Sequence, residues 1–276
     1  MSALQLLVVA AAGIAAMRAA ALRGDLDEAA RQGALAGPAV VSRALTARDR
    51  PTQLAAIAAA ALVEDRAELL APLARVAGGP DRQTAIPAAE VARTIARELA
   101  RRDRPDDLAA DDVAAWRAQW AELALRGDRW IELRVAALDT VVALDPAGIG
   151  VDLSAALRDA DPEFRRAAVS AVALPVPAAA HAALTGAVIH DVDPTTALAA
   201  AQSLCLSLEA TAQRAAILDA LGPDGLARIR ALVGQKPQPA TAAALRDLRR
   251  CVSYSGRGSP GSAIHKRAAS SRRSAQ

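Results

Sequence analysis

Residues 161–172 read DPEFRRAAVSAV, and residues 130–141 read WIELRVAALDTV. Each stretch carries an acidic residue, a bulky apolar residue, an arginine, paired alanines and a branched residue, in the same order. Arg165 in the later stretch corresponds to Arg134 in the earlier one, 31 residues before it. Because self-similarity at a fixed period is the signature of repeat folds, these stretches predict a periodic architecture.

A third, looser copy covers residues 193–204, where Ala197 stands in the place of the arginine. The second and third copies follow aspartate-rich turns, DADP at 159–162 and DVDP at 191–194. Asp161 and Asp193 are predicted to cap the helices that follow. The proline after each aspartate then occupies the first helical position, where no amide donor is needed.

Shorter apolar helices are expected between these copies, over residues 151–158 and 178–190. Each repeating unit is then a pair of helices in about 32 residues, and such a unit buries its apolar face by stacking on its neighbours. The run RRDRPDD at 101–107 interrupts the period. We expect it to be an exposed loop, followed by a helix capped by Asp111 or Asp112.

The composition favours helices over strands. Hydrophobic residues make up 53% of the chain but aromatic residues only 2%, so most apolar residues are alanine, leucine and valine. Alanine and leucine are strong helix formers, and few segments show the alternation typical of strands. Lys236 and Lys266 are the only lysines beside many arginines, which indicates a GC-rich bacterial genome. We therefore predict an all-α protein.

The spacing and the pattern D-x-D-P-x-x-R-x-A-A, best matched by residues 159–168, resemble HEAT repeats, including the HEAT-like units named after phycobilisome lyases. The resemblance covers about residues 38–235 and implies a right-handed α-solenoid of helical hairpins. HEAT-like arrays usually pair such arginines with turn aspartates of a neighbouring repeat. Arg134 and Arg165 would then form a structural ladder with aspartates of this kind, namely Asp128, Asp159 and Asp161, with Asp193 at the corresponding turn of the next copy.

The function that the resemblance implies is a non-catalytic scaffold for a protein partner, with no cofactor. The alternative is a HEAT-like enzyme, either a DNA glycosylase or a bilin-lyase-like protein. HEAT-like alkylpurine DNA glycosylases use tryptophans with an aspartate on a concave face, which makes Trp116, Trp120 and Trp130 candidate contacts for a partner or a base. No Trp–Asp spacing here matches such a motif, so we interpret the tryptophans as packing anchors where the period breaks.

The charge of the chain is unevenly distributed. The net charge is +3, but residues 251–276 hold five basic residues and no acidic one, which leaves 28 basic against 30 acidic residues in 1–250. A folded nucleic-acid binder usually carries its basic excess on the body. We therefore expect nucleic acid to bind only weakly, through a disordered basic tail at 251–276.

Candidates for metal and thiol chemistry are few. His181, His190 and His265 are the only histidines, and the sequence HDVD at 190–193 lies at a turn where this repeat already places capping aspartates. We predict no metal site. Cys205 is expected to be a small core residue, and its pairing with Cys251 in a disulfide requires an oxidising compartment and suitable geometry.

The chain begins with an uncharged apolar run, LLVVAAAGIAAM at residues 6–17. This run is too short for a membrane span but fits the apolar region of a secretory signal. We expect residues 1–22 to be a signal peptide or a first apolar helix, and residues 23–250 to form the solenoid. Export to the periplasm, with cleavage between residues 17 and 24, is predicted; the alternative is a buried first helix in a cytoplasmic protein.

Overall fold

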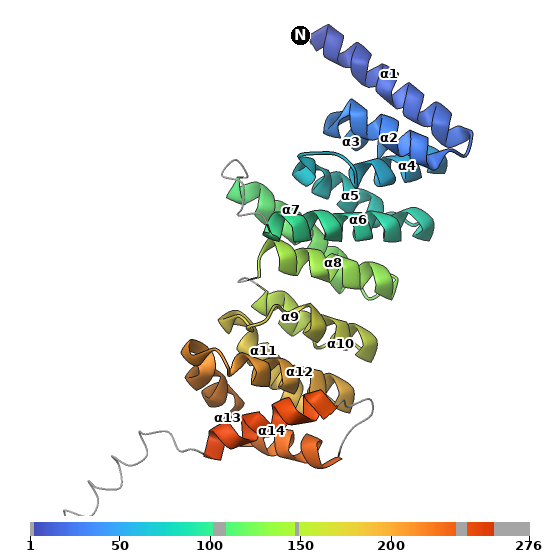
Figure 1. The fold of residues 1–276 in the computed structure, drawn as a ribbon. Helices are drawn as coiled ribbons and strands as arrows, with labels where there is room; N and C mark the ends of the chain where they lie inside the picture. Colours follow the sequence, from blue (N-terminus) through green and yellow to red (C-terminus); the bar gives the residue numbers. More distant parts are fainter. Residues whose placement is uncertain (1–2, 102–108, 147–148, 236–241, 257–276) are drawn as a thin grey trace, which may run out of the picture. The chain divides into compact units, whose positions relative to one another are not determined.

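The structure is a computed structural model that describes residues 3–101, 109–146, 149–235 and 242–256. Over these residues the chain is helical and contains no strand, so the all-α prediction is confirmed. The helices divide into two compact units, residues 1–171 and 172–276. Each unit is described separately below (Figure 1).

The first unit contains ten of the described α-helices and one short 3-10 helix, η1. Their bounds are α1 (Ala3–Leu22), α2 (Leu26–Ala36), α3 (Pro38–Ala44), α4 (Arg50–Ala60), η1 (Arg66–Leu69), α5 (Leu70–Ala77), α6 (Arg82–Arg101), α7 (Ala110–Leu125), α8 (Ile131–Leu144), α9 (Gly150–Ala156) and α10 (Pro162–Ala171).

The helices of the first unit pack on one another along the chain. Helix α2 packs on α4, α4 on α6, α6 on α8 and α8 on α10, as Figure 1 shows for the central helices. Helix α5 also packs on α7, and α7 on α9. Helices α4 and α6 begin 32 residues apart and α8 and α10 begin 31 residues apart, whereas α2 and α4 begin 24 residues apart. Two of these intervals match the predicted period, and a repeat architecture for the chain stays a prediction.

The period is broken between α6 and α8, whose first residues are 49 positions apart. Helix α6 has 20 residues and α7 has 16, so both are longer than the helices around them. Most of the loop predicted at 101–107 lies outside the described residues. The predicted cap of α7 was wrong: Ala109 is the N-cap, and Asp111 and Asp112 lie in the first helical turn, where negative charge favours the helix dipole.

Small side chains let the helices of the first unit approach closely. The clearest case is Gly33 of α2, where an added Cβ atom would lie 2.8 Å from the Cβ of Ala59 in α4 and 2.8 Å from the sulfur of Met17 in α1. Distances below 3.0 Å leave no room for a methyl group. The abundance of alanine therefore has a packing consequence as well as a helix-forming one.

Helix α1 covers the beginning of the array. It contacts α2, α3 and α4, and Met17, Ala20 and Ala21 near its end are buried. A buried first helix would pack in this way. The predicted cleavage would remove or expose these buried residues. Among the described residues, none of the helices combines the length and apolar character needed to cross a membrane.

The second unit contains the remaining described helices, which are α11 (Ala178–His190), α12 (Pro194–Ser207), α13 (Thr211–Gln235) and α14 (Ala242–Gly256). Helix α11 packs on α12 and α13, and α14 packs on α12 and α13. Helix α13 is interrupted at Gly222, which has a φ of 55° and precedes Pro223. Glycine tolerates this backbone conformation, and the proline starts the next helical segment.

The solenoid predicted over residues 23–250 stays a prediction, and the described helices fall into two compact units, divided in sequence between residues 171 and 172. One predicted boundary differs from the structure. The tail was expected to begin at residue 251, but α14 continues to Gly256 and Cys251 is buried one turn after Leu248. The remainder of the predicted tail, residues 257–276, lies outside the described residues.

Candidate functional site

The arginine of the first repeat copy, Arg134, is buried in the first unit with only 3% of its surface exposed. Its Nε donates a hydrogen bond of 3.0 Å to the carbonyl of Ala124, and its guanidinium forms an ion pair with Asp159. The guanidinium also lies over the ring of Phe164, 3.9 Å from the ring centre. A buried cation is tolerated when its charge and its donors are matched in this way.

The arginine of the second copy, Arg165, turns back onto the same segment. It is 8% exposed, and its Nη1 donates to the carbonyls of Asp159 at 2.9 Å and Ala160 at 3.3 Å. Arg134 and Arg165 thus converge on the turn between α9 and α10, one on the side chain of Asp159 and the other on its backbone. We call Arg134, Asp159, Phe164 and Arg165 the arginine cluster.

Electrostatics favours the ionised form of Asp159. Desolvation opposes ionisation, but hydrogen bonds from Arg134 and from the amide of Asp161, at 2.9 Å for the latter, together with the charges of both arginines, outweigh it. The pKa of Asp159 is therefore lowered below its ordinary value. The carboxylate of Asp159 binds both the guanidinium of Arg134 and the amide of Asp161 in its own turn. Its role is therefore structural.

The aspartates that follow in each turn cap helices. Asp161 accepts a 2.8 Å hydrogen bond from the amide of Glu163 in the first unit. Asp193, in the second unit, accepts hydrogen bonds from the amides and hydroxyls of Thr195 and Thr196. Desolvation works against ionisation of Asp193, yet these hydrogen bonds lower its pKa to about 2. Asp161 lies in the same turn as Asp159 of the arginine cluster, whereas Asp193 lies in a different turn, in the second unit.

The sequence interpretation missed a second periodic set of charges in the first unit. Arg18 of α1 pairs with Asp49, Arg50 of α4 pairs with Asp81, and Arg82 of α6 pairs with Glu132 of α8. The N–O distances are 3.5, 2.8 and 2.6 Å in that order. We call this set the edge ladder.

A signal for the edge ladder was present in the sequence. The dipeptide Asp-Arg occurs at 49–50 and again at 81–82, 32 residues later. In each case the aspartate precedes a helix and the arginine reaches the start of the next helix in the stack. The two partners of each ion pair are more than 30 residues apart in sequence. The dipeptides can be found in the sequence, but which residues pair depends on how the helices stack.

The three candidate tryptophans have different environments. Trp120 is fully buried and Trp116 is 9% exposed, so their side chains pack in the core of the first unit. Trp130 is half-buried at the N-terminus of α8. Arg129 lies over its ring at 5.9 Å and donates to the carbonyl of Gly79 at 2.9 Å. Trp130 is thus the one of the three that a partner could reach.

The other polar candidates have structural partners. Nε2 of His181 is buried 3.2 Å from the carbonyl of Val176, and Asp191 accepts a 2.8 Å hydrogen bond from the amide of Asp193. Within the described ranges no group of three or more histidine, cysteine or acidic side chains is arranged to hold a metal ion. His265 lies outside those ranges.

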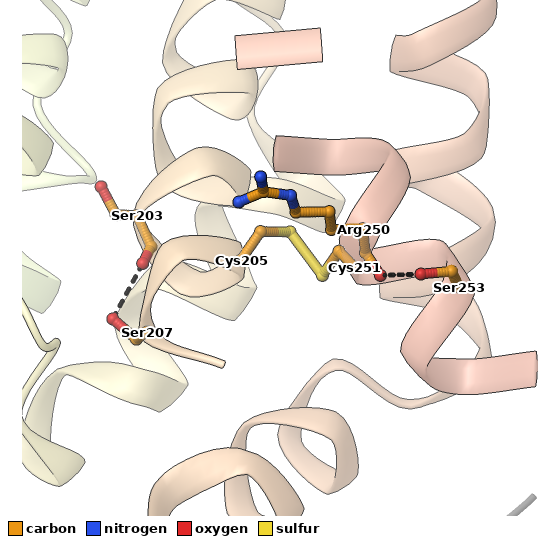
Figure 2. The surroundings of a disulfide bond; sticks show 6 residues. All are labelled: Ser203, Cys205, Ser207, Arg250, Cys251 and Ser253. Carbon is orange, nitrogen blue, oxygen red and sulfur yellow. Dashed lines mark hydrogen bonds between the residues drawn. A yellow bond between two sulfur atoms is a disulfide. The ribbon is translucent and has the colours of Figure 1, made fainter. Parts of the chain in front are cut away.

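The two cysteines, whose pairing the sequence left open, form a disulfide in the second unit (Figure 2). Cys205 lies in α12 and Cys251 in α14, with their Cα atoms 5.2 Å apart and their positions 46 residues apart in sequence. Cys205 is 4% exposed and Cys251 is fully buried. Neither thiol is free in this structure.

Comparison with known proteins finds no matching family model, no matching curated protein and no matching solved structure. The likeness to HEAT repeats therefore rests on the residues of this chain, namely its period and the residues of its turns.

Proposed function

We propose that the chain is a right-handed α-solenoid of HEAT-like helical hairpins and that it acts as a non-catalytic scaffold for a protein partner. The observation that carries the proposal is the edge ladder, in which arginines at the starts of α4 and α6 pair with acidic residues at or just before the starts of α6 and α8. Pairing between equivalent ends of consecutive repeats supports a stacked array. Such arrays offer an extended surface to partners and need no catalytic residue.

The residues best suited to chemistry are engaged in holding the fold. Trp116 and Trp120 are buried, and the two cysteine sulfurs are bonded to each other. An exposed tryptophan beside a carboxylate in a basic concave groove would have favoured the DNA glycosylase. A deep pocket with a free cysteine or histidine would have favoured the bilin lyase. The burial of these two tryptophans and the bond between the two cysteines support the scaffold.

Trp130 is the proposed partner contact. Its ring is half-buried, and the arginine that lies over it is itself anchored to a backbone carbonyl, so the indole is held in a fixed orientation. Rigid aromatic side chains of this kind contribute strongly to protein interfaces because little conformational entropy is lost on binding.

The test is capture of partners by the full-length protein from its native cell, with identification by mass spectrometry and affinity measurement for each partner. Trp130→Ala should weaken binding by about tenfold or more. Val192→Ala is the matched control, since Val192 is an apolar side chain 90% exposed in the second unit. Capture no better than that of an unrelated helical protein would contradict the scaffold. Equal losses in both variants would contradict the role of Trp130.

We also propose that the protein works in an oxidising compartment, as the predicted export implies. The Cys205–Cys251 disulfide supports this, because such bonds are rare where glutathione and thioredoxin keep thiols reduced. The burial of Met17 and Ala20 supports instead the alternative to cleavage, a retained first helix, so the cleavage is tested separately from the compartment. N-terminal sequencing and thiol titration of protein from the native cell test both points. Two titratable thiols in that protein would exclude the oxidising compartment, and cleavage between residues 17 and 24 would exclude the retained helix.

A further inference from the structure

Helix α14 packs on α12 and α13, and a disulfide and two polar contacts join it to one stripe of α12 and the turn after it. Three residues of α12 and the turn after it, spaced i, i+3 and i+7, contact it: Gln202, Cys205 and Glu209. Their partners in α14 are Asp247, Cys251 and Arg250, in that order. The disulfide is the central contact of the three, with a polar contact on either side. Figure 2 shows Arg250 and Cys251 next to Cys205.

Over residues 242–253, the part of α14 whose side chains are described, the buried residues are Ala244, Leu248 and Cys251, at i, i+4 and i+7, so they form a single stripe. Leu245 and Val252 are half-buried. Leu248 is the large apolar side chain of the three buried ones. Because hydrophobic stabilisation scales with the apolar area removed from water, this stripe contributes little compared with the core helices.

Two polar contacts lie beside the disulfide. Gln202 donates to Asp247 at 3.2 Å, and Arg250 pairs with Glu209 at 3.0 Å. The Arg250 and Glu209 side chains are 54% and 63% exposed, a setting in which ion pairs contribute little to stability. The disulfide is the covalent attachment of α14, in addition to the packing of this helix on α12 and α13.

We propose that the Cys205–Cys251 disulfide is a redox latch. In the oxidised protein α14 is held against α12 and α13 as a cap, with its exposed face, which includes Arg246 and Arg249, directed to water. In the reduced protein α14 detaches and uncovers the side of α12 that carries Cys205. Terminal elements of stacked arrays need such a polar outer face, so the latch controls access to the end of the second unit.

The latch closes by thiol–disulfide exchange with an oxidant that itself bears a disulfide. The thiolate of one cysteine attacks that disulfide and displaces one of its sulfurs, which leaves a mixed disulfide. The second cysteine, as its thiolate, then displaces the oxidant's other sulfur. Both cysteine thiols lose their protons, and two electrons pass to the oxidant, which leaves as a dithiol. A dithiol reductant such as dithiothreitol reverses each step.

Hydrogen exchange of the full-length chain, followed by mass spectrometry with and without dithiothreitol, tests the latch. On reduction, amides in 242–256 should exchange about tenfold faster or more, while those of α11 keep their protection. The first unit contains neither cysteine and is an internal control. Cys251→Ser should exchange fast over the same residues under both conditions and should not respond to the reductant.

Two further variants separate the covalent from the non-covalent attachment. Leu248→Ala should leave α14 protected in the oxidised protein and should speed its exchange further in the reduced one. Arg250→Ala, which removes the exposed ion pair, should resemble the wild type in both states. Unchanged protection of α14 after reduction would overturn the proposal. So would two titratable thiols in protein purified without reductant. Protection lost evenly throughout 172–256 would also overturn it, because the bond would then stabilise the whole unit. None of these readouts depends on a protein partner.

Discussion

The guanidinium of Arg134 lies 3.9 Å from the centre of the Phe164 ring, and it forms an ion pair with Asp159. Arg134 lies in α8 and Phe164 in α10, so the contact joins two helices that pack on each other. Phe164 is fully buried and is the only phenylalanine in the chain. The relationship explains why an arginine is buried in α8: it spans the interface with α10 and binds the turn that precedes α10.

Removing the buried arginine should destabilise the first unit strongly. Arg134→Ala leaves Asp159 without its ion pair and the Ala124 carbonyl without a donor, and we expect a loss of about 3–5 kcal/mol. Arg165→Ala, which loses hydrogen bonds to backbone carbonyls, should cost about 1–3 kcal/mol. Urea unfolding followed by tryptophan fluorescence measures both, because all three tryptophans belong to the first unit.

The control for this pair is Arg126→Ala. Arg126 pairs with Asp128 on the surface, where side-chain exposures are 40% and 65%, and its loss should leave the stability close to that of the wild type. Equal costs for Arg126→Ala and Arg134→Ala would contradict the structural role of the arginine cluster. Wild-type stability of Arg165→Ala, with partner binding lost, would instead make Arg165 part of the binding surface.

Acid should weaken the second unit through Asp193. The pKa of Asp193 is about 2 in the folded protein against an ordinary 3.8. A carboxylate with a lowered pKa stabilises the fold fully above its unfolded pKa and loses that contribution as the pH falls towards the folded value. We expect about 1–2 kcal/mol to disappear between about pH 4 and pH 2.

Asp193→Asn is the informative variant, because asparagine also caps helices but does not titrate. Thermal unfolding followed by circular dichroism, compared with the wild type at each pH, should show the difference in stability shrinking below about pH 4. A pH-independent difference between the two proteins would contradict the role assigned to this carboxylate.

Close helix packing at Gly33 should be intolerant of a single methyl group. Both Ala59 and Met17 would lie 2.8 Å from the added Cβ, so Gly33→Ala should destabilise the first unit by about 1–3 kcal/mol despite the better helix propensity of alanine. Gly186→Ala is the matched control: Gly186 also lies inside a helix, α11, but has nothing within 4 Å of the added atom. That variant should be stabilised by about 0.5–1 kcal/mol. Thermal unfolding followed by circular dichroism measures both variants. Stabilisation of both variants would show that α1, α2 and α4 are not packed as described.

Deleting the basic tail should remove most non-specific nucleic-acid binding. Residues 257–276 carry five basic residues and no acidic one, and their removal changes the net charge from +3 to −2. The shortened protein should end at Gly256, because α14, which carries Cys251 of the disulfide, extends to that residue. Fluorescence anisotropy with a labelled duplex at several salt concentrations measures the effect. Tight, steeply salt-dependent binding by the truncated protein would favour the glycosylase alternative over the scaffold.

The repeat pattern alone predicted the positions of several helices. The expected helix at 178–190 matches α11 residue for residue, and Asp193 caps α12 as its place before a proline predicted. These features are local: a capping side chain and the amide it accepts from lie within three residues of each other. The cap of α7 was assigned wrongly because aspartate is preferred at N-caps, whereas here Ala109 is the N-cap and the two aspartates lie in the first turn, which acidic residues also favour.

The sequence by itself determined that this chain is helical and that aspartates begin some of its helices. Only the tertiary structure decided which residues meet. It joined Cys205 to Cys251, stacked Arg134 on Phe164 and linked Arg50 to Asp81. It also buried Trp116 and Trp120 and left Trp130 within reach. The physical reason is that helix formation depends on neighbours within about four residues, whereas these contacts depend on how separate helices pack.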